Sequence, residues 1–192
     1  MKSTATTIAA ALAAFAIVLK LSNPALPENF WAFGGLALFC GYALQGSRTW
    51  TLPLAAFIAA DIIGHAIDDV ALGIYYPAAM LLNYAGLTAM CGVGAAMRGQ
   101  TNWIVICGGC LCGSAAFFLL SNFGAWLDPA MMYPRTLSGL YTSYIQGVPF
   151  ARGTVSGDLL FGASSILSYR WYLNMCVVPA DKAATTDAVS RV

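Results

Sequence analysis

The feature that most constrains this chain is a series of six apolar stretches separated by short polar breaks. A bilayer core about 30 Å thick is crossed by roughly 20 apolar helical residues, so each stretch is a candidate membrane span. We predict helices over residues 6–21, 30–45, 50–67, 75–97, 103–121 and 154–172. The predicted fold is therefore all-α: a polytopic, six-transmembrane-helix bundle over residues 1–178. The polar residues 179–192 are predicted to form a disordered cytoplasmic tail.

The composition excludes several classes of protein. Of the 192 residues, 59% are hydrophobic and 9% are charged, whereas soluble domains carry about 25% charged residues. The net charge of +1 and the scattered Lys and Arg residues argue against nucleic-acid binding. The six cysteines lie in or beside apolar segments, so we expect no disulfide framework. Cys107 and Cys110 form a C-x-x-C without a second ligand pair, which favours helix packing over zinc or redox chemistry. We expect no cofactor.

The first stretch begins like a secretory signal peptide, with Lys2 followed by an alanine-rich run. Its apolar run is long for a signal peptide, so we interpret it as a helix and leave its cleavage open. Ala9 and Ala13 give this helix a face of small residues, which suits close contact with another helix or with a partner subunit.

The positive charges predict the orientation in the membrane. If all six helices span, one side carries more Lys and Arg residues than the other: Lys2, Arg48, Arg98, Arg170, Lys182 and Arg191, against Lys20, Arg135 and Arg152. Cytoplasmic loops are enriched in such residues. We therefore predict a multi-pass protein of the cell inner membrane with both termini in the cytoplasm. The long connection over residues 122–153 would then lie outside.

Ionisable residues inside the predicted spans mark a candidate site. A central Asp costs about 2.5–3.5 kcal/mol to insert, so it normally faces a cavity or a partner. Asp61, His65 and Asp68 share one face of the third predicted helix, and Asn83 and Asp158 lie at similar predicted depths on the fourth and sixth. We predict an outward-facing pocket with Asp61 and Asp158 as its polar determinants. The alternative is that both carboxylates bond only to His65, Asn83, backbone groups or external arginines.

The predicted external segment is aromatic and rich in turns. Thr136 can cap a short helix over residues 137–146, which Pro149 would close. That helix would lie at the interface or cover a cavity. Six residues of this segment complete the predicted binding set: Asn122, Trp126, Tyr133, Arg135, Tyr144 and Arg152. Lipid anchoring is the alternative for the aromatic residues.

Several motifs carry a resemblance to a known family. They are PENF (27–30), ALFCG (37–41), P-x7-D (53–61), FFLLSNFGAWL (117–127), YPRTLSGL (133–140), Tyr144, Pro149 with Phe150, and GDLLF (157–161). With them the chain resembles an uncharacterised bacterial membrane family of transport proteins, itself similar to the substrate-binding S components of energy-coupling factor (ECF) transporters. The resemblance implies an S-component-like bundle whose pocket opens to the outside. Ser143 and Gly153 stand where this family has Cys and Asn. The N-terminal histidine motif of cobalt and nickel S components is missing, which argues against transition-metal uptake.

The leading functional prediction is a membrane subunit that binds or transports a small polar solute. No G-x-x-x-x-G-K-[ST] motif occurs, so a membrane coupling subunit and separate ATPase subunits would supply the energy. A structural or assembly protein of the membrane is the first alternative. An intramembrane acid–base enzyme using Asp61 and Asp158 is the second, but no GxGD, HExxH or Ser/His nucleophile motif supports it.

Overall fold

The computed structural model describes residues 2–22, 29–68 and 76–177, and within these ranges the regular secondary structure is helical. The all-α prediction is confirmed. The helices, with a short 3₁₀ turn and two π-helical segments, are α1 Lys2–Leu21, α2 Phe33–Ala43, α3 Arg48–Asp68, α4 Pro77–Ala96, α5 Trp103–Leu127, η2 Pro129–Met131, α6 Leu137–Gly157, η3 Asp158–Ala163, α7 Ser164–Tyr172 and η4 Leu173–Val177. The predicted tail over residues 179–192 lies outside the described residues.

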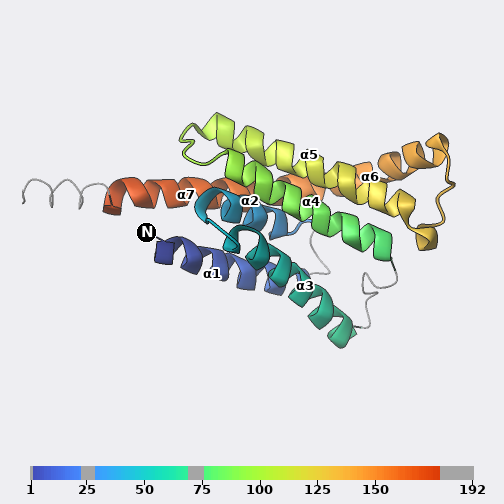
Figure 1. The fold of residues 1–192 in the computed structure, drawn as a ribbon, viewed down its shortest axis with the longest axis horizontal. Helices are drawn as coiled ribbons and strands as arrows, with labels where there is room; N and C mark the ends of the chain where they lie inside the picture. Colours follow the sequence, from blue (N-terminus) through green and yellow to red (C-terminus); the bar gives the residue numbers. More distant parts are fainter. Residues whose placement is uncertain (1, 23–28, 69–75, 178–192) are drawn as a thin grey trace, which may run out of the picture.

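The helices lie roughly along one long axis, and from α1 to α6 successive helices reverse direction, whereas α7 continues the line of α6 (Figure 1). Within the described residues, four helices are long and apolar enough to cross a membrane: Ser3–Leu21, Arg48–Ile67, Pro77–Ala96 and Trp103–Leu127. The second predicted span is shorter than expected, because α2 has 11 residues and extends only about 16 Å. The sixth predicted span belongs to a longer helical rod, in which α6, η3, α7 and η4 follow one another without a break.

The short helix α2 lies at the centre of the bundle and contacts α1, α3, α4, α5, α6, η3 and α7. Almost all of its side chains are buried, including Phe33, Leu36, Leu38 and Phe39. Its apolar sequence on every face therefore reflects burial among helices, as expected for a core helix. Glycines allow the closest approach: a Cβ at Gly41 would lie 2.1 Å from the carbonyl oxygen of Cys91 on α4.

The predicted short helix over residues 137–146 begins where predicted but ends later than predicted. The Thr136 hydroxyl accepts a hydrogen bond from the Gly139 N–H at 3.2 Å, which confirms the N-cap. The helix then passes through Pro149 and reaches Gly157. A buried face of small residues continues past the proline, and Pro149 lies on the exposed side, so packing outweighs the one lost donor.

Helix α5 also runs further than predicted, to Leu127. The connection predicted over residues 122–153 is therefore mostly helical, and the part between α5 and α6 covers residues 128–136. This difference matters for the site, because it places the aromatic segment on two packed helices.

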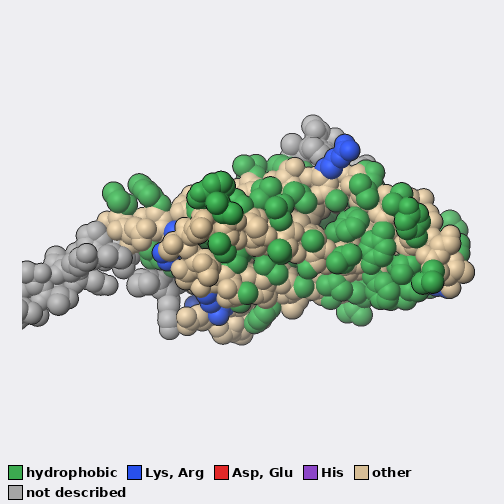
Figure 2. Space-filling model, turned by 90° about the horizontal axis from the view of Figure 1, so that it is seen from above, with side chains coloured by type: hydrophobic (Ala, Val, Ile, Leu, Met, Phe, Trp, Pro, Cys, Tyr) green, Lys and Arg blue, Asp and Glu red, His purple; other side chains and the backbone are tan. Residues whose placement is uncertain are grey.

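Large apolar side chains cover much of the surface. Figure 2 shows them spread along the face it displays. Exposed examples occur on α3, α4, α5 and η3, among them Ile62, Ile67, Leu81, Ile104 and Leu160. Extensive exposed apolar surface marks contact with a membrane or a partner. Together with four helices of membrane-spanning length, it indicates a membrane protein.

Candidate functional site

Asp158 is the most deeply buried carboxyl inside the helix bundle, with 1% of its surface exposed. It begins the π-helical segment η3, a local widening of the helix that recurs at functional sites. The Ser114 hydroxyl on α5 donates a hydrogen bond to its Oδ2 at 2.6 Å. Its Oδ1 faces α2 at Gly34, where a Cβ would lie only 2.0 Å away. Gly34 is therefore required for the carboxyl to occupy this position.

A narrow recess reaches this carboxyl. Four aromatic residues, Trp31, Phe33, Phe57 and Phe117, form much of its wall; the remaining lining residues are Asn29, Gly34, Leu87, Met90, Thr154 and Asp158. The recess offers about 20 Å³ to the centre of a water molecule, and about 10–15 Å³ is enough to hold one water. The recess therefore has room for one water molecule or a small polar group beside Asp158.

A larger cavity of about 460 Å³ lies between α5 and α6. Its lining is apolar with a few uncharged polar groups: Asn29, Phe117, Phe118, Ser121, Asn122, Ala125, Met131, Tyr133, Gln146, Gly147, Phe150, Ala151 and Thr154. Three of these residues, Asn29, Phe117 and Thr154, also line the recess. The two cavities therefore adjoin, with these three residues between them.

Two of the residues predicted from the external segment line this larger cavity. Asn122 faces Gly147 across the α5–α6 contact, and its Nδ2 donates to the Phe118 carbonyl at 2.8 Å. The Tyr133 hydroxyl donates to Oε1 of Gln146 at 2.7 Å. Sequence reasoning missed Gln146, although it lies two residues after the predicted Tyr144.

Three other predicted residues hold the α5–α6 connection together and line neither cavity. Arg135 donates to the carbonyls of Trp126 and Leu127 at the end of α5, and its guanidinium lies 5.7 Å from the Trp126 ring. The Trp126 Nε1–H donates to the Pro134 carbonyl at 2.9 Å. The Tyr144 hydroxyl donates to the Leu119 carbonyl at 3.0 Å. The two Arg135 contacts satisfy carbonyls at the end of α5, where such groups need partners, and the Tyr144 contact joins α6 to α5.

Among the described residues, Arg152 forms no ion pair with Asp61 or Asp158, and the partners of the buried Asp128 are backbone groups. Asp128 is also 1% exposed, but its Oδ2 accepts from the N–H groups of Ala78 and Ala79 at 3.0 and 3.2 Å, which caps α4. Its Oδ1 accepts from the Ala130 N–H at 3.1 Å. Arg152 is exposed on α6 and lines neither cavity. Within the described residues, the ion pair found joins Lys20 and Asp61.

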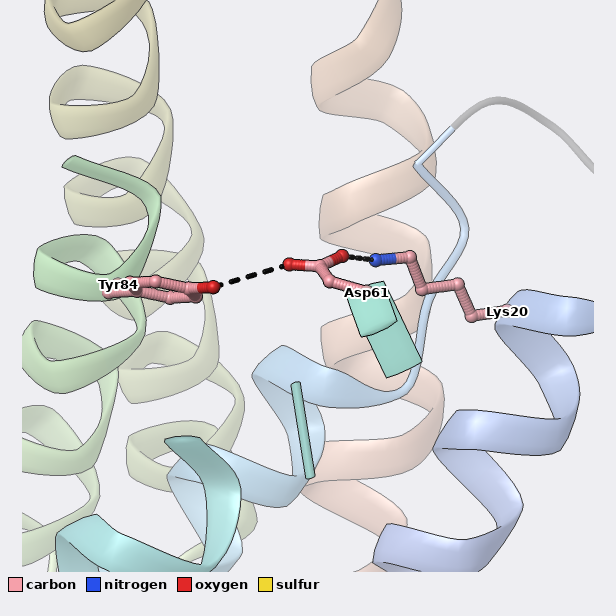
Figure 3. A network of polar contacts seen from close by, with 3 residues as sticks. All are labelled: Lys20, Asp61 and Tyr84. Carbon is pink, nitrogen blue, oxygen red and sulfur yellow. Dashed lines mark hydrogen bonds and ion pairs between the residues drawn. The ribbon is translucent and has the colours of Figure 1, made fainter. Parts of the chain in front are cut away.

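Asp61, unlike Asp158, lies between charged and polar side chains of two other helices (Figure 3). The Lys20 ammonium on α1 pairs with its Oδ1, and the Tyr84 hydroxyl on α4 lies 3.4 Å from its Oδ2. Each side chain of the Lys20–Asp61 pair is 19% exposed. Asp61 lines neither cavity. The predicted shared pocket with Asp158 is therefore not seen, and sequence reasoning missed Lys20 as the partner because α1 was not expected beside α3.

The remaining predicted residues also lie outside the two cavities. His65 follows Asp61 by one turn of α3, and Asn83 precedes Tyr84 on α4; both are half-buried. The side chain of Asp68 lies outside the described part of the chain. On the same helical rod as Asp158, the small Gly162 leaves room for a neighbouring helix and packs against Gly35 and Leu38 of α2.

Comparison with known proteins places this arrangement in a family. The chain belongs to a family of unknown function, DUF6580. The match covers residues 1–176, which include every residue of both cavities. No curated protein and no solved structure matches the chain. Membership in DUF6580 thus extends over the whole described bundle and assigns no activity to it.

Proposed function

We propose that this DUF6580 protein is a membrane subunit that binds a small polar solute for transport. The observation that carries the proposal is Asp158, a deeply buried carboxyl that lines the recess beside the larger cavity. A charged group inside a membrane protein is costly and usually serves a ligand or ion pathway. The proposal assigns binding and movement of a solute, and no catalysis.

The hydrogen-bond partners of Asp158 support a ligand-binding role over a purely structural one. A carboxylate has about four acceptor positions, and a buried structural carboxylate is normally saturated by donors. In the described structure Ser114 donates to Asp158, and no Lys or Arg side chain forms an ion pair with it. The carboxyl lines the recess, where a ligand can supply the remaining donors.

The proposed arrangement in the membrane follows the charge count. The larger cavity lies toward the end of α5 and the start of α6, away from the N-terminus (Figure 1). The charge count predicts that the protein lies in the inner membrane with both termini in the cytoplasm. In that orientation the larger cavity opens to the outside of the membrane. In this S-component-like arrangement of six crossings, α2 is the short second crossing and the rod of α6, η3 and α7 is the long sixth one. Energy would come from a membrane coupling subunit and ATPase subunits.

Thermal unfolding of the purified protein tests the proposal. We expect at least one compound in a panel of vitamins, nucleobases, amino acids and amines to raise the melting temperature, because a ligand specific to the folded state stabilises it. Asp158→Asn is expected to abolish that shift. Arg152→Gln, on an exposed side chain outside both cavities, is the matched control. A shift that survives Asp158→Asn, or no shift with any compound, contradicts the proposal.

A further inference from the structure

The described residues that line the two cavities include an acidic side chain and no basic one. Among the described residues that line them, Asp158 is the one carboxyl, and no Lys, Arg or His is present. An anionic ligand would therefore meet a buried acid without a compensating cation. Like charges placed together in a medium of low dielectric repel strongly. The lining thus disfavours an anionic solute.

The aromatic wall of the recess adds a second, independent preference. The faces of Trp, Tyr and Phe rings attract cations within about 6 Å of the ring centre. Four of the ten lining residues of the recess are aromatic, namely Trp31, Phe33, Phe57 and Phe117. A carboxyl at the end of an aromatic recess is the combination that recognises an ammonium group.

The protein already holds one ammonium against part of this wall. The Lys20 Nζ lies 4.6 Å from the Phe57 ring centre, 5.2 Å from that of Trp31 and 6.0 Å from that of Phe33. Lys20 does not itself line the recess. Asp61 neutralises the charge of Lys20. The Lys20–Asp61 pair therefore leaves little net positive field to oppose a second ammonium inside the recess.

From these observations, and resting on the proposed function, we propose that the solute is an organic cation, a primary amine or related ammonium compound. Its ammonium group lies in the recess and donates to Asp158. Its apolar part passes Phe117 and Thr154, where the cavities adjoin. The larger cavity then receives the rest of the molecule, where Asn122, Tyr133 and Gln146 offer uncharged hydrogen-bonding groups.

Three probes of similar shape and different charge test this inference: benzylammonium, benzyl alcohol and benzoate. Binding to the full-length protein in lipid nanodiscs is measured by ligand-observed NMR titration. We expect benzylammonium to bind about tenfold more tightly than benzyl alcohol, from the charge-assisted bond to Asp158. Benzoate is expected to bind most weakly. Equal affinities, tighter binding of benzoate, or no saturable binding of benzylammonium overturns the cation proposal.

Two variants test whether the preference for a cationic ligand arises in this recess. Asp158→Asn is expected to bring the affinities of benzylammonium and benzyl alcohol within about twofold of each other, because the paired charge is lost. Phe117→Leu is expected to weaken benzylammonium about threefold, through loss of a cation–π contact, with less effect on benzyl alcohol. A charge preference that persists in both variants overturns the assignment to this recess. Should Asp158→Asn fail to fold, Phe117→Leu still tests it.

The result also separates this inference from the proposed function. If the metabolite panel yields a neutral or anionic ligand whose effect requires Asp158, the binding function stands and the cation proposal is wrong. If neither the panel nor the three probes bind, both are wrong.

Discussion

Asp128 and Asp158 are equally buried, at 1% exposure each, but their surroundings differ. Asp128 lies at the turn after α5, where three backbone N–H groups occupy both of its oxygens. Asp158 lies inside the bundle, where one serine hydroxyl donates to it and a cavity adjoins it. Burial alone therefore does not identify a functional carboxylate. The number and kind of its partners distinguish a structural cap from a candidate ligand site.

Asp61 is an intermediate case. It is less buried than either of the others, and its charge is compensated by Lys20 within the protein. Its pairing joins α1 to α3 and, through Tyr84, approaches α4. We therefore expect changes at or beside the three carboxylates to lower the free energy of unfolding by different amounts. Four substitutions, given from the largest expected loss to the smallest, test this.

The largest expected loss of stability follows Asp128→Ala. It leaves the N-terminal N–H groups of α4 and that of Ala130 without their acceptor in a buried place. We expect the free energy of unfolding to fall by about 2–4 kcal/mol, from a lost helix cap and buried unpaired donors. Unfolding in mixed micelles measures the change. Asp128→Asn keeps one acceptor oxygen, so its loss of stability should be about half as large. If Asp128→Ala leaves the free energy of unfolding unchanged, Asp128 is not a structural cap.

A smaller loss is expected from Gly34→Ala, which tests the packing around Asp158. The new Cβ would lie 2.0 Å from the Asp158 Oδ1 and 2.6 Å from the Met90 Cε. Overpacking of this kind costs about 1–3 kcal/mol, and the same change narrows the recess. Gly92→Ala on α4 is the matched control, because a Cβ there meets no atom within 4 Å. Equal stability of the two variants would contradict the described position of Asp158.

Lys20→Met tests how much the Lys20–Asp61 ion pair contributes to stability. It keeps the apolar stem of the side chain and leaves the Asp61 charge without its cation. Loss of one partner of a buried pair costs about 3–5 kcal/mol, and the 19% exposure of both side chains reduces our expectation to about 1–2 kcal/mol. The double variant Lys20→Met/Asp61→Leu should recover part of the loss. If the two substitutions are instead additive, the pair contributes no coupling energy.

The smallest effect on stability is expected from Asp158→Asn. Ser114 can still donate to the amide oxygen, and the cost of burying a charge disappears, so we expect a change within about 1 kcal/mol. The same variant should lose solute binding. A loss as large as that of Asp128→Ala, measured under the same conditions, would place Asp158 among the structural carboxylates.

The sequence predicted the local features of the fold well. The apolar stretches were long and periodic enough to predict all six helical regions, and Thr136 was read correctly as an N-cap. It failed where packing overrides a local signal. Pro149 predicts a helix end, but the buried glycines and Ser143 on the opposite face keep α6 helical through it. Likewise, an apolar stretch of spanning length predicted a longer helix than the 11 residues of α2.

For the candidate site, the sequence by itself determined that carboxylates would lie inside an apolar bundle, because Asp61 and Asp158 interrupt spans that otherwise exclude charge. It also supplied Asn122 and Tyr133 of the larger cavity. Only the tertiary structure decided which partners each carboxylate meets. Lys20, Ser114 and Gly34 come from helices distant in sequence, and one helix's periodicity carries no information about the residues that face it across a helix contact.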